Sequence, residues 1–238
     1  MGRRIDLGEF DADVVFKKIK NVHLSVYPPD GKVRISAPSH MNLDTIRVYA
    51  ISKLAWIKRQ RKKLREQERE TPREFIDRES HYVWGKRYLL TVVEEDAPPR
   101  VELGHRSMKL YVRPGTGDDA RDAIVSQWLR DQIRAALPEL LARWEPRLGV
   151  KVKKVFIQHM KTRWGSCNPK AGHVRLNTDL AKKPPECLEY ILVHEMAHLI
   201  EPTHNERFVA IMEKFMPKWK FHRDQLNRLP VRHEEWGY

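Results

Sequence analysis

The stretch Val193-His-Glu-Met-Ala-His-Leu-Ile-Glu-Pro-Thr-His204 contains three histidines and a glutamate at a spacing that suits a metal ion. If the stretch is helical, His194 and His198 are one turn apart and can direct two imidazoles at one ion. Glu195 then lies beside that ion without coordinating it, which is the position that a general base requires. The segment therefore predicts a catalytic zinc site of a metal-dependent hydrolase, with one zinc ion per chain.

The third ligand must come from elsewhere, and His204 is the first candidate because it follows a helix-ending Glu-Pro-Thr. Thr203 and Glu206 have capping-box spacing, which predicts that a second helix starts there with His204 in its first turn. Carboxylates also bind zinc, so three glutamates remain competing ligands: Glu201, Glu206 and Glu213. Glu201 occupies the position where the metzincin signature has a glycine, so membership of that class does not follow.

Composition and charge narrow the class of protein. The chain has 238 residues and 41% hydrophobic content, enough to bury a sizeable core. No apolar run approaches the roughly 20 residues needed to cross a bilayer, and the N-terminus lacks the apolar core of a signal peptide. We therefore expect a cytoplasmic protein without a membrane segment. Two cysteines, Cys167 and Cys187, are too few for a disulfide framework, and we expect packed thiols.

The net charge of +13 indicates acidic partners, which could be nucleic acid, nucleotides or acidic peptides. The densest basic run covers residues 58–65 and has no interleaved aromatic residues of the kind that stack on bases. A solvated helix face explains this run better than a dedicated site. Nucleic-acid binding therefore follows from charge alone, without the support of a motif.

The N-terminal part has the pattern of a β-structure with one long helix. Residues 22–26 and 33–37 alternate apolar and polar side chains around a Pro-Pro-Asp-Gly turn at 28–31, which predicts a hairpin. Asn42 is a suitable N-cap for a helix that continues to residue 57 and into the basic run, fraying through residues 65–72. Strand patterns return at 82–84, 88–92, 101–103 and 110–112, which together with the hairpin suggest a small antiparallel sheet.

The strongest break in the pattern is Pro114-Gly-Thr-Gly-Asp-Asp119, and it predicts two domains, 1–117 and 118–238. After it, a helical stripe interrupted by Pro138 predicts one kinked helix or two consecutive helices ending at Gly149. Strands are expected at 150–158 and 173–177, just before the helix with the histidines. The fold class is therefore α+β, and the order in the second half is typical of zincins, in which an edge strand borders the metal cleft.

Several segments together resemble one family: Thr162-Arg-Trp-Gly-Ser-Cys167, Val174-Arg-Leu-Asn177, Glu189 to Leu199, and then His204 and Phe208. These segments are similar to the YgjP-like (WLM/SprT-related) zinc metallopeptidases, and the resemblance covers essentially the whole chain. It implies a zincin-like C-terminal half, a peptide or protein substrate, and zinc held by His194, His198 and His204. It also implies that Glu195 is the catalytic glutamate.

The expected reaction is peptide hydrolysis by a metal-activated water that gives its proton to Glu195. The oxyanion donor is not determined, and the candidates are Arg163, His159, His173 and His222. Trp164 and Gly165 are expected to shape the cleft, and Asn177 either lines it or binds backbone near the edge strand.

Two rival functions remain open. The basic charge around a hydrolytic metal also fits a nucleotide or phosphate-ester hydrolase, although the sequence has neither a Gly-rich phosphate loop nor a paired-carboxylate cluster. The second rival is a DNA-associated protease or adaptor with weak activity, whose N-terminal sheet and basic helix would localise it. Steeply salt-dependent DNA binding would support that function.

Overall fold

A four-stranded sheet begins the chain. The computed structural model describes residues 3–27, 31–66, 74–161 and 163–228. The first sheet has the strands β1 (Arg3–Asp6), β2 (Asp11–Lys17), β3 (His23–Tyr27) and β4 (Lys32–Pro38), in the order β1-β2-β4-β3. β3 and β4 pair antiparallel, which confirms the predicted hairpin, although its turn at 28–30 lies outside the described residues. β2 and β4 pair parallel, so the expectation of a purely antiparallel sheet is wrong.

The two helices that follow were expected as one. α1 (Leu43–Ser52) begins at the predicted N-cap, where the Asn42 side chain accepts a hydrogen bond from the Thr45 amide at 2.8 Å. The helix ends at Ser52 with Lys53 as its C-cap, and α2 (Leu54–Glu66) starts directly after it. Apolar residues of both helices are fully buried in one core with the sheet, at Ile46 and Ile57. The helical period therefore runs through the break, which explains why the sequence suggested one helix. The fraying expected at 65–72 falls largely outside the described residues.

A second sheet repeats the arrangement of the first. Its strands are β5 (Ser80–Val83), β6 (Lys86–Glu94), β7 (Arg100–Leu103) and β8 (Ser107–Val112), in the order β5-β6-β8-β7. The central pair β6 and β8 is parallel, and both outer pairs are antiparallel, as in the first sheet. The N-terminal half thus contains two sheets of the same topology instead of one.

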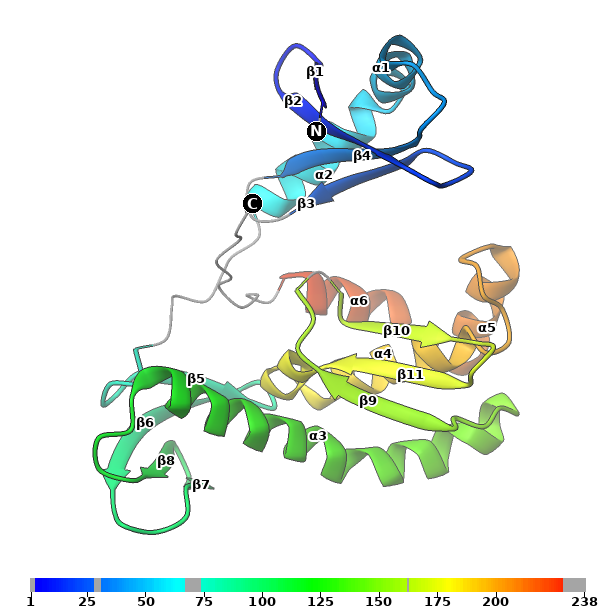
Figure 1. The fold of residues 1–238 in the computed structure, drawn as a ribbon. Coiled ribbons are helices and arrows are strands. Elements are labelled where there is room, and N and C mark those ends of the chain that lie inside the picture. The colour runs from blue at the N-terminus through cyan, green and yellow to red at the C-terminus, as the bar shows by residue number, and fades with distance from the viewer. Residues whose placement is uncertain (1–2, 28–30, 67–73, 162, 229–238) are drawn as a thin grey trace. The chain divides into compact units, whose positions relative to one another are not determined.

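The longest helix, α3 (Asp118–Leu148), is continuous. Pro138 lies inside it on the exposed side, where water can satisfy the backbone carbonyl that proline leaves without a donor. Gly149 ends the helix in the left-handed conformation with φ of 67°, as the sequence indicated. α3 runs from the β5–β8 sheet past the strand β9 (Lys154–Gln158), as Figure 1 shows.

A three-stranded sheet follows α3 in the chain. Its order is β10 (Gly165–Asn168), β11 (His173–Asn177) and β9, with β11 antiparallel to β10 and parallel to β9. β10 lies between the two strands expected from the sequence, at 150–158 and 173–177, and was not predicted. The short 3-10 helix η1 (Thr178–Lys182) leads into α4 (Pro185–Ala197), which is followed by α5 (Glu206–Phe215) and α6 (Trp219–Arg228).

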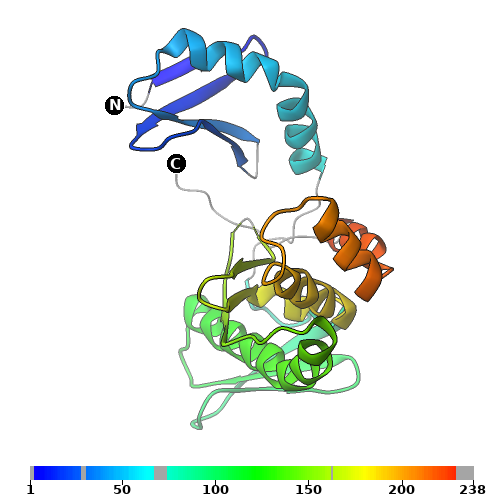
Figure 2. The same ribbon diagram turned by 90° about the vertical axis from the view of Figure 1, so that its right-hand side faces the viewer.

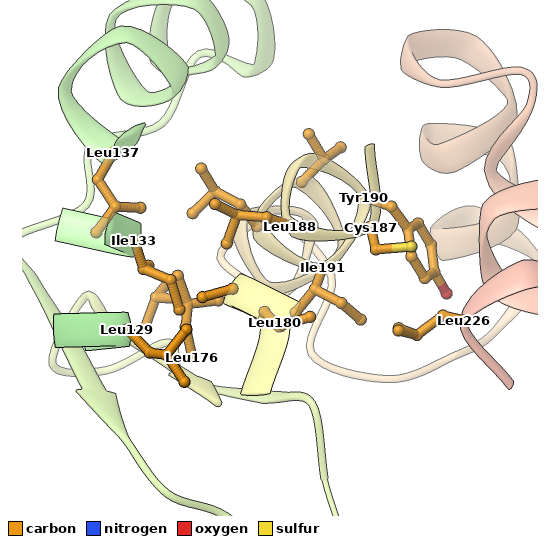
Figure 3. Close-up of a cluster of buried hydrophobic side chains, with 14 of the residues drawn as sticks. Leu129, Ile133, Leu137, Leu176, Leu180, Cys187, Leu188, Tyr190, Ile191 and Leu226 are labelled. Atoms are coloured by element: carbon orange, nitrogen blue, oxygen red, sulfur yellow. The ribbon is translucent and has the colours of Figure 1, made fainter. Parts of the chain in front are cut away.

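α4 is the central helix of this part of the molecule. α3 lies on one side of it and α6 on the other (Figure 2). The close-up in Figure 3 shows Ile133 and Leu137 of α3 on one side of Leu188, and Leu226 of α6 beside Tyr190 on the other. Leu188 is 1% exposed and Leu192 is fully buried. A helix packed on both sides in this way gives the side chains at its end a fixed position.

The boundary between the two compact units lies near residue 69, whereas the sequence placed a domain boundary between 117 and 118. The physical reason is that the second sheet shares its core with α3. Leu90, Leu110 and Val112 of that sheet belong to the same buried cluster as Leu129 and Ile133. The polar segment after β8 is therefore a connection within one unit. The α+β fold class is confirmed.

Candidate metal centre

Two of the three histidines proposed as metal ligands, His194 and His198, lie at the end of α4. Pro185 is the first residue of this helix, where a missing amide hydrogen has no cost, and the helix runs to Ala197. His194 lies in its last turn, and His198 is the C-cap residue. The two imidazole rings lie 5.0 Å apart between centroids. The helical spacing therefore brings both rings to one end of α4.

His204 completes a cluster of three imidazoles. Its Nε2 lies 3.0 Å from Nε2 of His194 and 3.1 Å from Nε2 of His198. One ring nitrogen from each histidine falls within 4.8 Å of the others. Tetrahedral zinc, with metal–nitrogen bonds of about 2.0–2.1 Å, holds its ligand nitrogens roughly 3.3 Å apart. The cluster therefore fits one divalent ion.

The electrostatics of the cluster also fit a cation. Burial lowers the pKa of His194 to about 3, and the neighbouring His198 and His204 add to this shift. The pKa of His198 is also lowered, mainly by burial. Neutral imidazoles offer lone pairs, which is the form that binds metal. The competing ligands Glu201, Glu206 and Glu213 do not belong to the cluster.

His204 precedes α5 and does not belong to its first turn, so the expected capping box is wrong. The N-cap is Asn205, whose side-chain oxygen accepts a hydrogen bond from the Phe208 amide at 3.0 Å. Thr203 instead bonds Glu201, with 2.9 Å between Oγ1 and Oε1. Both Thr203 and Asn205 are good N-cap residues, and spacing alone did not distinguish them.

Phe208 forms the base of the cluster, a role that the sequence did not reveal. This residue is 2% exposed. Its ring centroid lies 4.9 Å from that of His194, 4.6 Å from that of His198 and 4.8 Å from that of His204. The only available signal was its place in the family resemblance. Phe208 restricts how the three imidazoles can turn.

Glu195 directly follows His194 on α4 and is 6% exposed. A Cβ atom on Gly165 would come within 2.7 Å of Glu195 Oε1 and 2.9 Å of Ile191 Cγ2, so only glycine allows β10 to approach α4 this closely. Burial raises the pKa of Glu195 to about 8, and the charge of Arg163 opposes this shift. A buried carboxylate with a raised pKa is suited to taking up a proton.

Asn177 holds a loop in place, and this is the second of the two roles considered from the sequence. The side chain is 4% exposed. Its amide nitrogen donates to the carbonyls of Met160 at 2.7 Å and Arg163 at 2.8 Å. The Asn177 backbone amide donates to the Trp164 carbonyl at 2.9 Å. Asn177 therefore fixes the chain on either side of Arg163 and Trp164.

The three histidines considered as oxyanion donors contact other parts of the protein or are buried in a helix. His159 Nδ1 is 3.9 Å from Asp179 Oδ2, and the His173 ring lies edge-on to Phe156 at 5.5 Å. His222 belongs to α6, where its Nδ1 is buried. Within the described part of the chain, Arg163 is the one candidate with an electrostatic influence on Glu195.

Comparison with known proteins defines the class. The family model of the YgjP-like metallopeptidase domain matches residues 20–229. The protein is therefore a metallopeptidase, a hydrolase that requires a metal ion and acts on peptides or proteins. More particularly, the chain belongs to the YgjP-like family.

A solved structure is also similar to part of the chain. The chain is similar to the metallopeptidase zymogen abylysin of Pyrococcus abyssi, with 29% sequence identity and a TM-score of 0.35. That similarity covers 37% of this chain and 90% of abylysin. No curated protein matches the chain. Among the described residues, no helix is both long and apolar enough to span a membrane.

Proposed function

We propose that the protein is a zinc-dependent peptidase of zincin-like architecture, in which His194, His198 and His204 hold one zinc ion and Glu195 is the general base. The observation that carries this proposal is the convergence of three Nε2 atoms at the end of α4, the helix in which the buried Glu195 directly follows His194. Three imidazole ligands leave a fourth position on the ion open, as in catalytic zinc sites.

Zinc bound there would polarise the scissile carbonyl and lower the pKa of a water molecule towards neutrality. Glu195 accepts the proton of the attacking water and later donates it to the leaving amine. Arg163, held through its backbone by Asn177, supplies positive charge near Glu195 and is our candidate to stabilise the oxyanion. Trp164 and Gly165 form the adjoining wall of the cleft.

The strand β10 is the proposed guide for the substrate backbone. Among the described strands it pairs with β11 alone, so no described strand occupies its other edge, and there we place an extended peptide. The close contact between Gly165 and Glu195 brings this edge next to the general base. A peptide added to β10 would therefore present a carbonyl group near the three histidines.

The test compares three variants in peptide hydrolysis and zinc content. Glu195→Gln keeps the shape of the side chain but cannot take up the proton, so the rate should fall on the order of 10²–10⁴-fold with zinc retained. His194→Ala should lose zinc as well. Glu186→Gln changes an exposed glutamate in the first turn of the same helix and should leave both unchanged. Full activity of Glu195→Gln would contradict the mechanism.

A second arm of the same experiment addresses the rival reaction. Nucleoside triphosphates are offered to the protein because its net charge of +13 attracts polyanions. We expect peptide cleavage without phosphate release. Phosphate release without peptide cleavage would instead assign the metal centre to a phosphate-ester hydrolase.

A further inference from the structure

The segment between His198 and His204 lies outside the helices, yet a chain of hydrogen bonds holds it. It connects two of the three proposed ligands, so its geometry sets the distance between them. Two backbone amides after α4 donate to the Ala197 carbonyl, Ile200 at 3.0 Å and Glu201 at 2.9 Å. The backbone of Glu201 is therefore tied to the end of α4.

Glu201 orients the second ligand through its backbone. Nδ1 of His198 lies 3.1 Å from the Glu201 carbonyl oxygen. A carbonyl oxygen only accepts, so this contact requires hydrogen on Nδ1. Nε2 of His198, which faces the cluster, then keeps its lone pair.

Glu201 also constrains the third ligand, through its carboxylate. Oε1 accepts hydrogen bonds from the Thr203 amide at 3.2 Å and from Thr203 Oγ1 at 2.9 Å. The Asn205 side chain donates to Thr203 Oγ1 at 3.1 Å, and the same side chain caps α5. His204 lies between Thr203 and Asn205, so the residues on both sides of it are fixed.

We propose that Glu201 is a positioning residue for the metal, which orients His198 with its carbonyl and fixes the loop that presents His204 with its carboxylate. This inference rests on the proposed function, because it presumes a metal held by the three histidines. Its physical basis is preorganisation: a loop that is already ordered loses less conformational freedom when the ion binds. Glu201 acts here without coordinating the ion, in contrast to its alternative role as a ligand.

The experiment measures zinc affinity by competition with a chromophoric chelator. Glu201→Ala should weaken binding about 10-fold, at the lower end of the range for residues that support metal ligands. Glu206→Ala, an exposed glutamate in the first turn of α5, is the matched control and should bind as the wild type does. Glu201→Ala keeps the backbone carbonyl beside His198 and removes only the carboxylate, so the comparison tests the carboxylate's hold on the loop before His204. Equal affinities of the two variants would overturn the proposal, because the carboxylate would then have no part in positioning His204.

A double-mutant cycle tests the route through Thr203. Thr203→Val should also weaken zinc binding. The loss of affinity should be smaller in the Glu201→Ala background, because the hydrogen bond between Thr203 Oγ1 and the Glu201 carboxylate is already absent there. Independent effects of the two substitutions would contradict the proposed link. Wild-type zinc binding and peptide cleavage test the proposed function itself, so the two failures are distinguishable.

Cobalt-substituted protein separates a positioning residue from a ligand. Absorption bands of Co²⁺ report its coordination geometry. If Glu201 only positions the histidines, saturated Glu201→Ala should give the wild-type spectrum despite its weaker binding. A changed spectrum at saturation would identify Glu201 as a ligand and overturn the proposal.

Discussion

Gly165 determines how closely the edge strand approaches the proposed general base. Its backbone has no positive φ, so the requirement for glycine comes from space and not from conformation. The atoms that a Cβ would meet belong to Glu195 and Ile191, and Ile191 is 6% exposed in the core. Side chains in a packed core have little room to shift, so an added Cβ atom at position 165 would displace the Glu195 side chain.

Gly165→Ala should therefore lower kcat/KM on the order of 10²-fold, since misplacing a catalytic group by about 1 Å has this effect. Zinc content should stay unchanged because the histidines lie outside the contact. Gly117→Ala is the control: a Cβ atom added there would meet no described atom within 4 Å, and the φ of this residue is −75°. Equal activity of the two variants in a steady-state peptide assay would contradict this account of the cleft.

At the scale of elements, the turn between β5 and β6 supports the start of α4. Trp84 and Gly85 both have positive φ, 48° and 75°. Their amides donate to the carbonyls of Ala181 at 2.7 Å and Lys182 at 3.2 Å, at the end of η1. A Cβ on Gly85 would lie 2.9 Å from Cγ of Pro184, the residue before α4. The hairpin thus contacts the chain just where the central helix begins.

Gly85→Ala should destabilise the protein for two reasons. The left-handed conformation costs an ordinary residue about 1–2 kcal/mol, and the contact with Pro184 adds to this. Gly115→Ala has a similar φ of +78° in open space, so it should suffer the conformational cost alone. Urea unfolding measures both variants, and the loss should be larger for Gly85→Ala. Equal losses would show that the contact with Pro184 contributes nothing.

Local spacing made parts of this architecture predictable. The cap at Asn42, the end of α3 at Gly149 and the pairing of His194 with His198 all depend on residues within one or two turns. The strand β10 was missed because its sequence, Gly-Ser-Cys-Asn, has no apolar alternation. It is a strand because it pairs with β11, which the sequence pattern of β10 itself does not indicate. Asn177 was ambiguous because its bonds reach residues 14 and 17 positions away.

The pairing of strands in the sheets could not be predicted from local spacing either. Alternation of apolar residues indicates which face of a strand is buried but not which strand lies beside it. The parallel pairs β2 with β4 and β6 with β8 each skip a strand in the chain order. The sequence therefore indicated the strands themselves without their division into two sheets.

At the scale of the whole molecule, the two compact units have separate cores. The buried residues of the first core lie between Ile5 and Ile57, and those of the second between Phe75 and Leu226. All three histidines, Glu195 and Gly165 lie in the second unit. The proposed chemistry therefore requires only the second unit to be folded.

A fragment of residues 70–238 should consequently fold and bind zinc as the full chain does, because it retains the entire second core. Circular dichroism during heating and zinc titration measure the two properties. An unfolded fragment, or one without zinc affinity, would show that the first unit stabilises the metal centre.

The most direct test of the central claim is metal analysis of the purified protein beside its His204→Ala and Glu206→Ala variants. A centre of three histidines predicts about one zinc ion per chain in the wild type and in Glu206→Ala. His204→Ala should retain little zinc after dialysis against a chelator, since one of its three ligands is gone. Wild-type zinc content in His204→Ala, or loss of zinc from Glu206→Ala, would contradict the three-histidine centre.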